Sequence, residues 1–147
     1  MKILLILISV FTFTKCGLAQ QDYCDFETSK VIYFGAYTGS FDSARVNPLP
    51  NSVNASGFCG MYIRDTNLYD NMKIYPNSKL VDVSPYATFT SLKIKMKLFT
   101  SAPVGTSIKL QLGVKSDDNY PAGVHSEYIA TTSVQNGWQL LTFNFWQ

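Results

Sequence analysis

The residues that could perform catalysis are few and are not arranged for it. His125 is the only histidine of the chain, and the segment around it lacks the strand-turn-helix setting that presents a catalytic serine. Zinc requires three or four closely grouped His or Cys ligands, and the sequence has no such group. A glycosidase needs two carboxylates across a cleft, which the spacing of the acidic residues does not favour: Asp65, Asp70, Asp82 and Glu127. We therefore expect a protein that is not an enzyme.

Aromatic and polar side chains supply the means to bind carbohydrate. The chain has nine Tyr, ten Phe and two Trp. Sugar sites stack an aromatic ring on the apolar face of a pyranose and place amide, carboxylate and guanidinium groups around its hydroxyls. The candidate contact residues lie in loops or at strand ends: Tyr62, Arg64, Tyr69, Tyr75, Asp118, Tyr120 and Trp138. Ordinary surface tyrosines, and a Trp138 packed at the rim of a sheet, are the alternatives.

Four lysines form a further candidate feature: Lys93, Lys95, Lys97 and Lys109. Alternation with apolar residues places them on one face of a predicted sheet. Such a basic stripe suits a solvated surface that resists aggregation. It also suits attraction to an acidic polysaccharide, in which case binding would weaken as salt is added.

The elements that must position these residues are strands. From Ser91 to Leu98, and again from Ser107 to Val114, apolar and polar residues alternate with the period of a half-buried strand. Pro103 and Gly105 mark a turn between the two segments. We predict that these two strands pair as a hairpin.

Weaker strand patterns flank this pair, and no segment shows sustained helical periodicity. They cover Lys30–Tyr37, Phe58–Arg64, Glu127–Val134 and Trp138–Phe145. The segments between them are long and polar, as in loops: Gly39–Gly57, Asp65–Lys79 and Lys115–Gly123. Several short strands joined in this way predict an all-β protein, an antiparallel β-sandwich.

The N-terminus has the pattern of an export signal. Lys2 precedes the short apolar run Ile3–Phe13, and Gly17–Ala19 provides the small residues of a cleavage site. The run is too short for a membrane span. We expect residues 1–19 to be a signal peptide, residues 20–147 to form one domain without a transmembrane segment, and the product to be secreted or held at the cell surface. Cleavage removes two lysines, Lys2 and Lys15, from a chain of net charge +2, so the mature chain carries equal numbers of basic and acidic residues. Its charge therefore does not favour nucleic acid as a partner.

Export also affects the cysteines. Cys24 and Cys59 remain after cleavage, and an oxidising compartment would allow them to form a disulfide. The bridge would close a loop of about 35 residues and stabilise the fold by roughly 3–4 kcal/mol. Two separate buried thiols are the alternative.

Several short segments occur in a familiar order. They are Asp25–Glu27, Asn47–Pro48, Asn54–Gly57, Tyr62–Arg64, Leu92–Lys97, Pro103–Gly105 and Gly137–Phe145. Together they resemble the carbohydrate-binding-module-like, galactose-binding-domain-like jelly rolls of secreted glycoside hydrolases and surface proteins from Bacteroidetes-type bacteria. The resemblance implies a jelly roll that binds polysaccharide without cleaving it. A cell-surface structural or adhesion module that contacts a partner protein through an open sheet edge is the alternative.

The resemblance carries two further implications. Such modules often hold a structural Ca²⁺ between carboxylates of the first and last strands, and Asp25 and Glu27 offer hard oxygen ligands on the first. Solvated carboxylates are the alternative. The family continues beyond the strand at Trp138–Phe145, whereas this sequence stops at Gln147. We therefore expect an incomplete jelly roll with an open edge, either truncated or completed by another chain.

Overall fold

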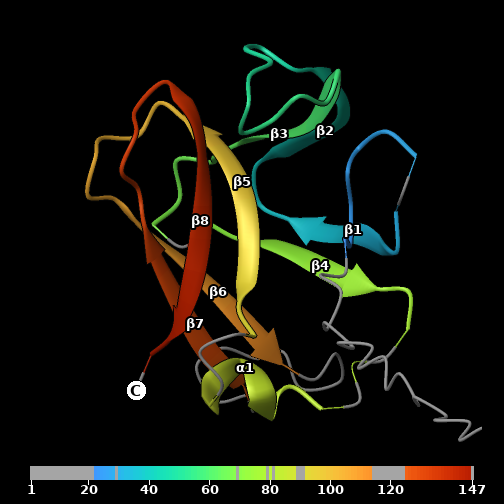
Figure 1. The fold of residues 1–147 in the computed structure, drawn as a ribbon, viewed down its shortest axis with the longest axis vertical. Helices are drawn as coiled ribbons and strands as arrows, with labels where there is room; N and C mark the ends of the chain where they lie inside the picture. The colour runs from blue at the N-terminus through green and yellow to red at the C-terminus, as the bar shows by residue number, and fades with distance from the viewer. Residues whose placement is uncertain are drawn as a thin grey trace, which may run out of the picture.

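The computed structural model of the chain describes residues 22–28, 30–68, 70–78, 80, 82–88, 92–113 and 125–146 (Figure 1). Its strands are β1 (Ile32–Tyr37), β2 (Ser40–Val46), β3 (Phe58–Ile63), β4 (Met72–Pro76), β5 (Ile94–Thr100), β6 (Ser107–Gly113), β7 (His125–Thr131) and β8 (Gly137–Phe145). All their pairings are antiparallel, which confirms the all-β prediction. A jelly-roll sandwich is not confirmed, because the described strands form two two-stranded sheets and one four-stranded sheet.

The four-stranded sheet has the strand order β5-β8-β7-β6. β5 pairs with β8 and β6 with β7 along their lengths, whereas β7 and β8 share only the pairs Tyr128–Phe145 and Ile129–Asn144. Figure 1 shows the two strand pairs running in different directions. The sheet therefore consists of two ribbons, β5–β8 and β6–β7, joined near the end of β8.

The predicted hairpin between the two strongly alternating segments is wrong. A turn does connect them, with Gly105 at a φ of 91° and a bond from the Thr106 N–H to the Pro103 carbonyl. However, β5 and β6 lie at opposite edges of the sheet, with β8 and β7 between them. The alternation fixed which side chains face inward, but it held no information on which strands are hydrogen-bonded.

Side chains of both ribbons form the core. Tyr128 and Phe143 are each 1% exposed and pack with Ala130 and Leu141. Partly buried residues of the outer strands surround this cluster: Ile94, Met96, Leu98, Ile108, Leu110 and Leu112. Burial of one such large apolar side chain stabilises the fold by about 1.5–3 kcal/mol. On β5 and β6 the inward positions are those that the period of two predicted, whereas Phe145, expected on the same face as Leu141 and Phe143, is 37% exposed.

The other two sheets are the ribbons β1–β4 and β2–β3. The predicted strands at Lys30–Tyr37 and Phe58–Arg64 are confirmed as β1 and β3, but β2 and β4 fall in segments predicted to be loops. An aromatic contact joins the two ribbons, since Phe34 lies against Phe41 with ring centroids 4.3 Å apart. The Phe26 ring lies against Gly60, where an added Cβ would be 2.6 Å from it, so a larger residue there would force that ring to shift.

Two further contacts connect the parts of the fold. The helix α1 (Ser84–Thr88) was not predicted; its Tyr86 packs on the core cluster. Burial, followed by a hydrogen bond to Tyr86, raises the pKa of Tyr23 to about 12. Asn47 accepts a hydrogen bond from the indole of Trp138 on β8, at 2.9 Å.

In the part of the chain described, no helix has the length and apolar character to cross a membrane.

Candidate functional site

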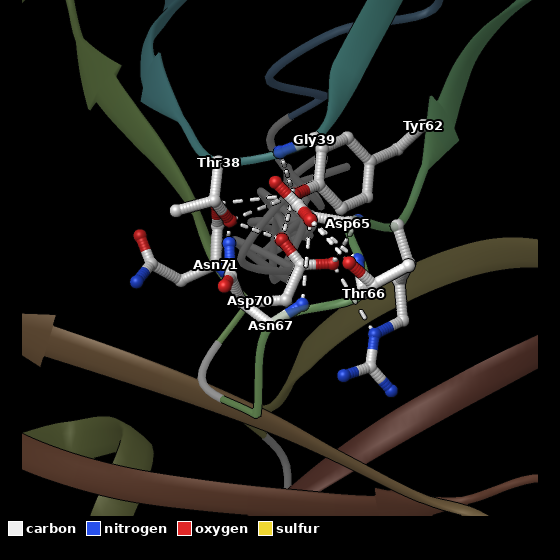
Figure 2. A network of polar contacts seen from close by, with 9 residues as sticks. Thr38, Gly39, Tyr62, Asp65, Thr66, Asn67, Asp70 and Asn71 are labelled. Carbon is white, nitrogen blue, oxygen red and sulfur yellow. Dashed lines mark hydrogen bonds and ion pairs between the residues drawn. The ribbon is translucent and has the colours of Figure 1, made fainter.

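A polar network centred on Asp70 brings together residues from three segments (Figure 2). The carboxylate oxygen Oδ1 accepts hydrogen bonds from Thr38, just after β1, and from the Tyr62 hydroxyl on β3. Oδ2 accepts one from the Asp65 N–H at 3.1 Å and one from Arg64 Nε at 3.2 Å. The Asp70 side chain is fully shielded from solvent. The network therefore ties the turn after β1 to the end of β3.

These donors set the ionisation of Asp70. Hydrogen bonds from Thr38 and then from Tyr62 hold the pKa of the Asp70 carboxyl below its ordinary value, although burial acts in the opposite direction. A carboxylate that is ionised and fully engaged with donors is poorly suited to take up or release a proton in catalysis. The cluster thus favours a positioning role for Asp70.

The residue that Asp70 positions toward solvent is Arg64. Its Nε is bound by the carboxylate, while 69% of its side-chain surface is exposed. A guanidinium held at Nε can still donate paired hydrogen bonds from its two terminal nitrogens to a carboxylate or to neighbouring hydroxyls. The prediction placed Tyr62 and Arg64 in one site, and both do contact Asp70. The role of Asp70 was missed, because its partners lie on segments whose proximity only the fold reveals.

A second constellation, the tyrosine pair, lies on the ribbon β1–β4. Tyr33 and Tyr75 are cross-strand partners, and their rings stack with centroids 5.1 Å apart and planes inclined by 28°. Tyr33 is 42% exposed. The ring of Tyr75 also lies across Gly35, where an added Cβ would be 2.2 Å from Tyr75 Cε2. Gly35 is therefore required for this placement of the ring.

The tyrosine pair and the Asp70 network belong to one continuous stretch of structure. Asn71, whose N–H donates to the Thr38 hydroxyl at 3.1 Å, directly precedes β4, and Tyr75 lies near the end of that strand. Asn71 and Tyr75 are four positions apart in the sequence, which is roughly 13 Å along an extended chain. Tyr75 was predicted as a contact residue. Tyr33 was missed, because a predicted loop in place of β4 gave it no cross-strand partner.

Trp138 has a structural role, which corrects its inclusion among the predicted contact residues. It is buried, its ring meets Phe99 edge-on, and its indole N–H donates to Asn47. No ring face is left on which a sugar could stack. This is the alternative of rim packing that the sequence had left open.

The carboxylates predicted to bind calcium accept hydrogen bonds from the backbone. Asp25 Oδ1 receives the N–H groups of Glu27 and Thr28, at 2.8 and 3.0 Å. Glu27 Oε1 receives those of Gly57 and Phe58. Among the described residues, no group of three or more His, Cys, Asp or Glu is arranged to hold a metal ion. The calcium site stays a prediction.

The predicted disulfide is not formed in the structure, where Cys24 and Cys59 are both free thiols. Cys24 forms an isolated bridge with Lys30, whereas Cys59 lies buried on β3, opposite Arg45 of β2. The two cysteines thus belong to different strand pairings. Burial, the largest effect, raises the pKa of the Cys59 thiol.

Several predictions fall outside the described residues. They are the signal peptide at residues 1–19 and the contact residues Tyr69, Asp118 and Tyr120.

Comparison of the chain with protein-family models, with curated proteins and with solved structures gives no match. Any functional statement therefore depends on the arrangement of the residues themselves.

Proposed function

We propose that this chain is a non-catalytic, secreted or cell-surface module, of the jelly-roll, galactose-binding-like kind, that binds polysaccharide. The observation that supports this proposal is the tyrosine pair. Tyr75 is seated on Gly35 and stacked on the half-exposed Tyr33. Such a pair offers ring surface for the apolar face of a pyranose.

The Asp70 network supplies the polar half of the proposed site. Arg64 presents its guanidinium to solvent while Asp70 fixes its Nε. Paired donors of this kind suit neighbouring sugar hydroxyls or a ring carboxylate. The ionised, fully hydrogen-bonded Asp70 supports binding without bond cleavage. By binding glycan, the module would hold a separate catalytic or surface protein near its substrate and raise the effective concentration there.

Affinity for glycan is tested with tyrosine variants. Tyr33→Ala and Tyr75→Ala should each weaken binding to a neutral insoluble polysaccharide about tenfold, as expected for an aromatic contact residue. Tyr37→Ala is the matched control, because Tyr37 is also exposed (44%) but its ring packs on Phe41. A glycan array identifies the sugar, and a pull-down gives the affinity. Equal binding by the wild type and both variants on every glycan that is retained would refute this site.

Gly35→Ala separates ring placement from stability. The new methyl group would collide with the outer part of the Tyr75 ring, and a flexible side chain can move aside without disrupting the strand. We expect glycan binding to fall as it does in Tyr75→Ala, with a Tm close to that of the wild type. Unchanged binding would mean that the seated position of Tyr75 is irrelevant to the ligand.

A structural or adhesion module that contacts a partner protein is a second candidate function. The ribbon β2–β3 supports it, since both of its strands have an open edge in the described sheets. Its cross-strand pair Val46 and Phe58 is exposed, at 67% and 43%. Open edges and exposed apolar side chains both mark protein contacts. Replacing Val46 and Phe58 with Thr should abolish co-purification of such a partner and leave glycan binding intact.

A further inference from the structure

The outward face of the ribbon β5–β8 is a basic surface, which we call the lysine face. Lys95 and Lys97 of β5 are exposed and lie opposite Thr142 and Leu140 of β8. Leu140 is 53% exposed, so this part of the face is open to solvent. Further along the same face, at the pair Phe99 and Trp138, the ring of Trp138 is buried and bonded to Asn47. The period of two adds Asn144 of β8 to this face, together with Lys93, which directly precedes β5, and Trp146, which directly follows β8.

Among the residues that the structure describes, nothing neutralises the charge of the lysine face locally. Neither β5 nor β8 contains an acidic residue. Within the described ranges, no carboxylate lies within ion-pair distance of Lys93, Lys95 or Lys97. The sequence had grouped Lys109 with these lysines. Lys109 instead lies on β6, where its Nζ is 2.7 Å from Glu127, so it does not belong to this face.

The spacing of the lysines suits a linear ligand. Successive outward residues of a strand lie roughly 6.8 Å apart, so the three ammonium groups form a row along one edge strand. Beside this row, Thr142 and Asn144 offer hydroxyl and amide groups, and Trp146 is 58% exposed. The arrangement matches a polymer that has repeated negative charges, many hydroxyls and apolar ring faces.

We propose that the lysine face binds an acidic polysaccharide, one with carboxylate or sulfate groups on successive sugars. This inference rests on the proposed glycan-binding function and assigns a ligand class to a second surface. Sugar hydroxyls can form hydrogen bonds with Thr142 and Asn144, and a sugar ring can stack on Trp146. A phosphate backbone would make fewer of these contacts. The small net charge of the chain, +2, provides no general attraction to nucleic acid.

The experiment compares two double variants with equal change in charge. Lys95→Gln/Lys97→Gln alters the lysine face. Lys30→Gln/Arg45→Gln alters exposed cations outside β5–β8. Binding of the full chain to alginate, heparin and neutral dextran is measured at low and at physiological salt. At low salt the first variant should bind alginate or heparin roughly 30-fold more weakly, at about fivefold per lysine beside a polyanionic surface. The control should stay within about threefold of the wild type, and added salt should narrow the difference.

Four results would overturn the inference. They are no binding to either polyanion, equal losses in the two variants, tighter binding to a DNA duplex than to heparin, and tighter binding to vesicles that contain phosphatidylserine. Trp146→Ala adds a readout, since it should weaken binding without changing the salt dependence. The tyrosine-pair variants keep the two proposals separate. If neutral glycan binds through Tyr33 and Tyr75 while the lysine variant behaves as wild type, only the present inference fails.

Discussion

Replacement of Asn47 by Ala should be among the most destabilising polar substitutions in this protein. The side chain is almost fully buried and makes four hydrogen bonds. Its amide group donates to the carbonyls of Asn54 and Ser56. Its oxygen accepts from the Leu49 N–H and from the indole of Trp138, a residue 91 positions along the chain. One amide thus holds the segment after β2 closed and attaches it to β8.

The magnitude follows from the partners that Asn47→Ala leaves behind. Each hydrogen bond contributes about 0.5–1.5 kcal/mol net, and the buried indole N–H would also lack an acceptor. We therefore expect a loss of about 2–5 kcal/mol in the free energy of unfolding. Trp138→Phe removes one of the four bonds and some ring volume, for a loss of about 1–3 kcal/mol. The free energy of unfolding of the double variant should fall by about 1 kcal/mol less than the sum of the two single losses, because the two groups are in direct contact.

The assay is urea unfolding followed by far-ultraviolet circular dichroism, because Trp138→Phe removes a fluorescent probe. Asn67→Ala is the matched control, since Asn67 is exposed and its side chain makes no hydrogen bond within the described residues. It should change the free energy of unfolding by less than about 0.5 kcal/mol. An Asn47→Ala protein as stable as this control, or losses that simply add in the double variant, would refute the account of Asn47 as a link between the two segments.

Further predictions concern the core, acid stability, the thiols and the metal. Phe143→Ala should cost about 3–5 kcal/mol in urea unfolding, and a loss under 1 kcal/mol would contradict its place at the centre of the core. Hydrogen bonds from Lys109 and then Gln111 hold the pKa of the Glu127 carboxyl below its ordinary value of 4.5. The stability that this lowered pKa contributes is therefore present above pH 4.5 and lost as the pH falls through the pKa of Glu127 in the folded protein. Glu127→Gln should reduce the acid dependence of Tm. A variant whose Tm depends on pH as that of the wild type does would argue against the contacts with Lys109 and Gln111. Dithiothreitol should leave Tm unchanged. Iodoacetamide should modify the buried Cys59 only on unfolding, and modification of Cys59 in the folded protein at the rate of a solvent-exposed thiol would contradict its burial. Calcium at the predicted first-strand carboxylates should raise Tm and a chelator should lower it, and a Tm that responds to neither would remove that site.

Local pattern predicted strand faces well and strand partners poorly. Alternation placed Ile94 and Met96 inward and Lys95 outward, because side-chain direction along a strand depends only on neighbouring residues. Hydrogen-bonded partners depend on contacts distant in the sequence, so β5 was paired with β6 in place of β8. The strands β2 and β4 were missed, because most of their side chains are exposed or only partly buried and lack a strong apolar period.

The candidate site shows the same division. Tyr62 and Arg64 were selected because they end a predicted strand, and that position does bring them to one carboxylate. Asp70 gave no signal of its own, since a single acidic residue in a polar segment resembles any solvated loop residue. Gly35 is the clue that sequence reasoning could have used: a glycine inside an aromatic, β-branched strand indicates that something approaches the backbone closely, and here it is Tyr75.

Few hydrogen bonds cross between the two halves of the four-stranded sheet. Two residue pairs and the bond from the Trp146 N–H to the Glu127 carbonyl join β7 to β8, all near the end of the chain described. Side-chain packing must therefore keep the halves together. We expect native opening to begin at this seam, so the amide protons of Ile129 and Asn144 should exchange with solvent deuterium sooner than those inside the β5–β8 ladder.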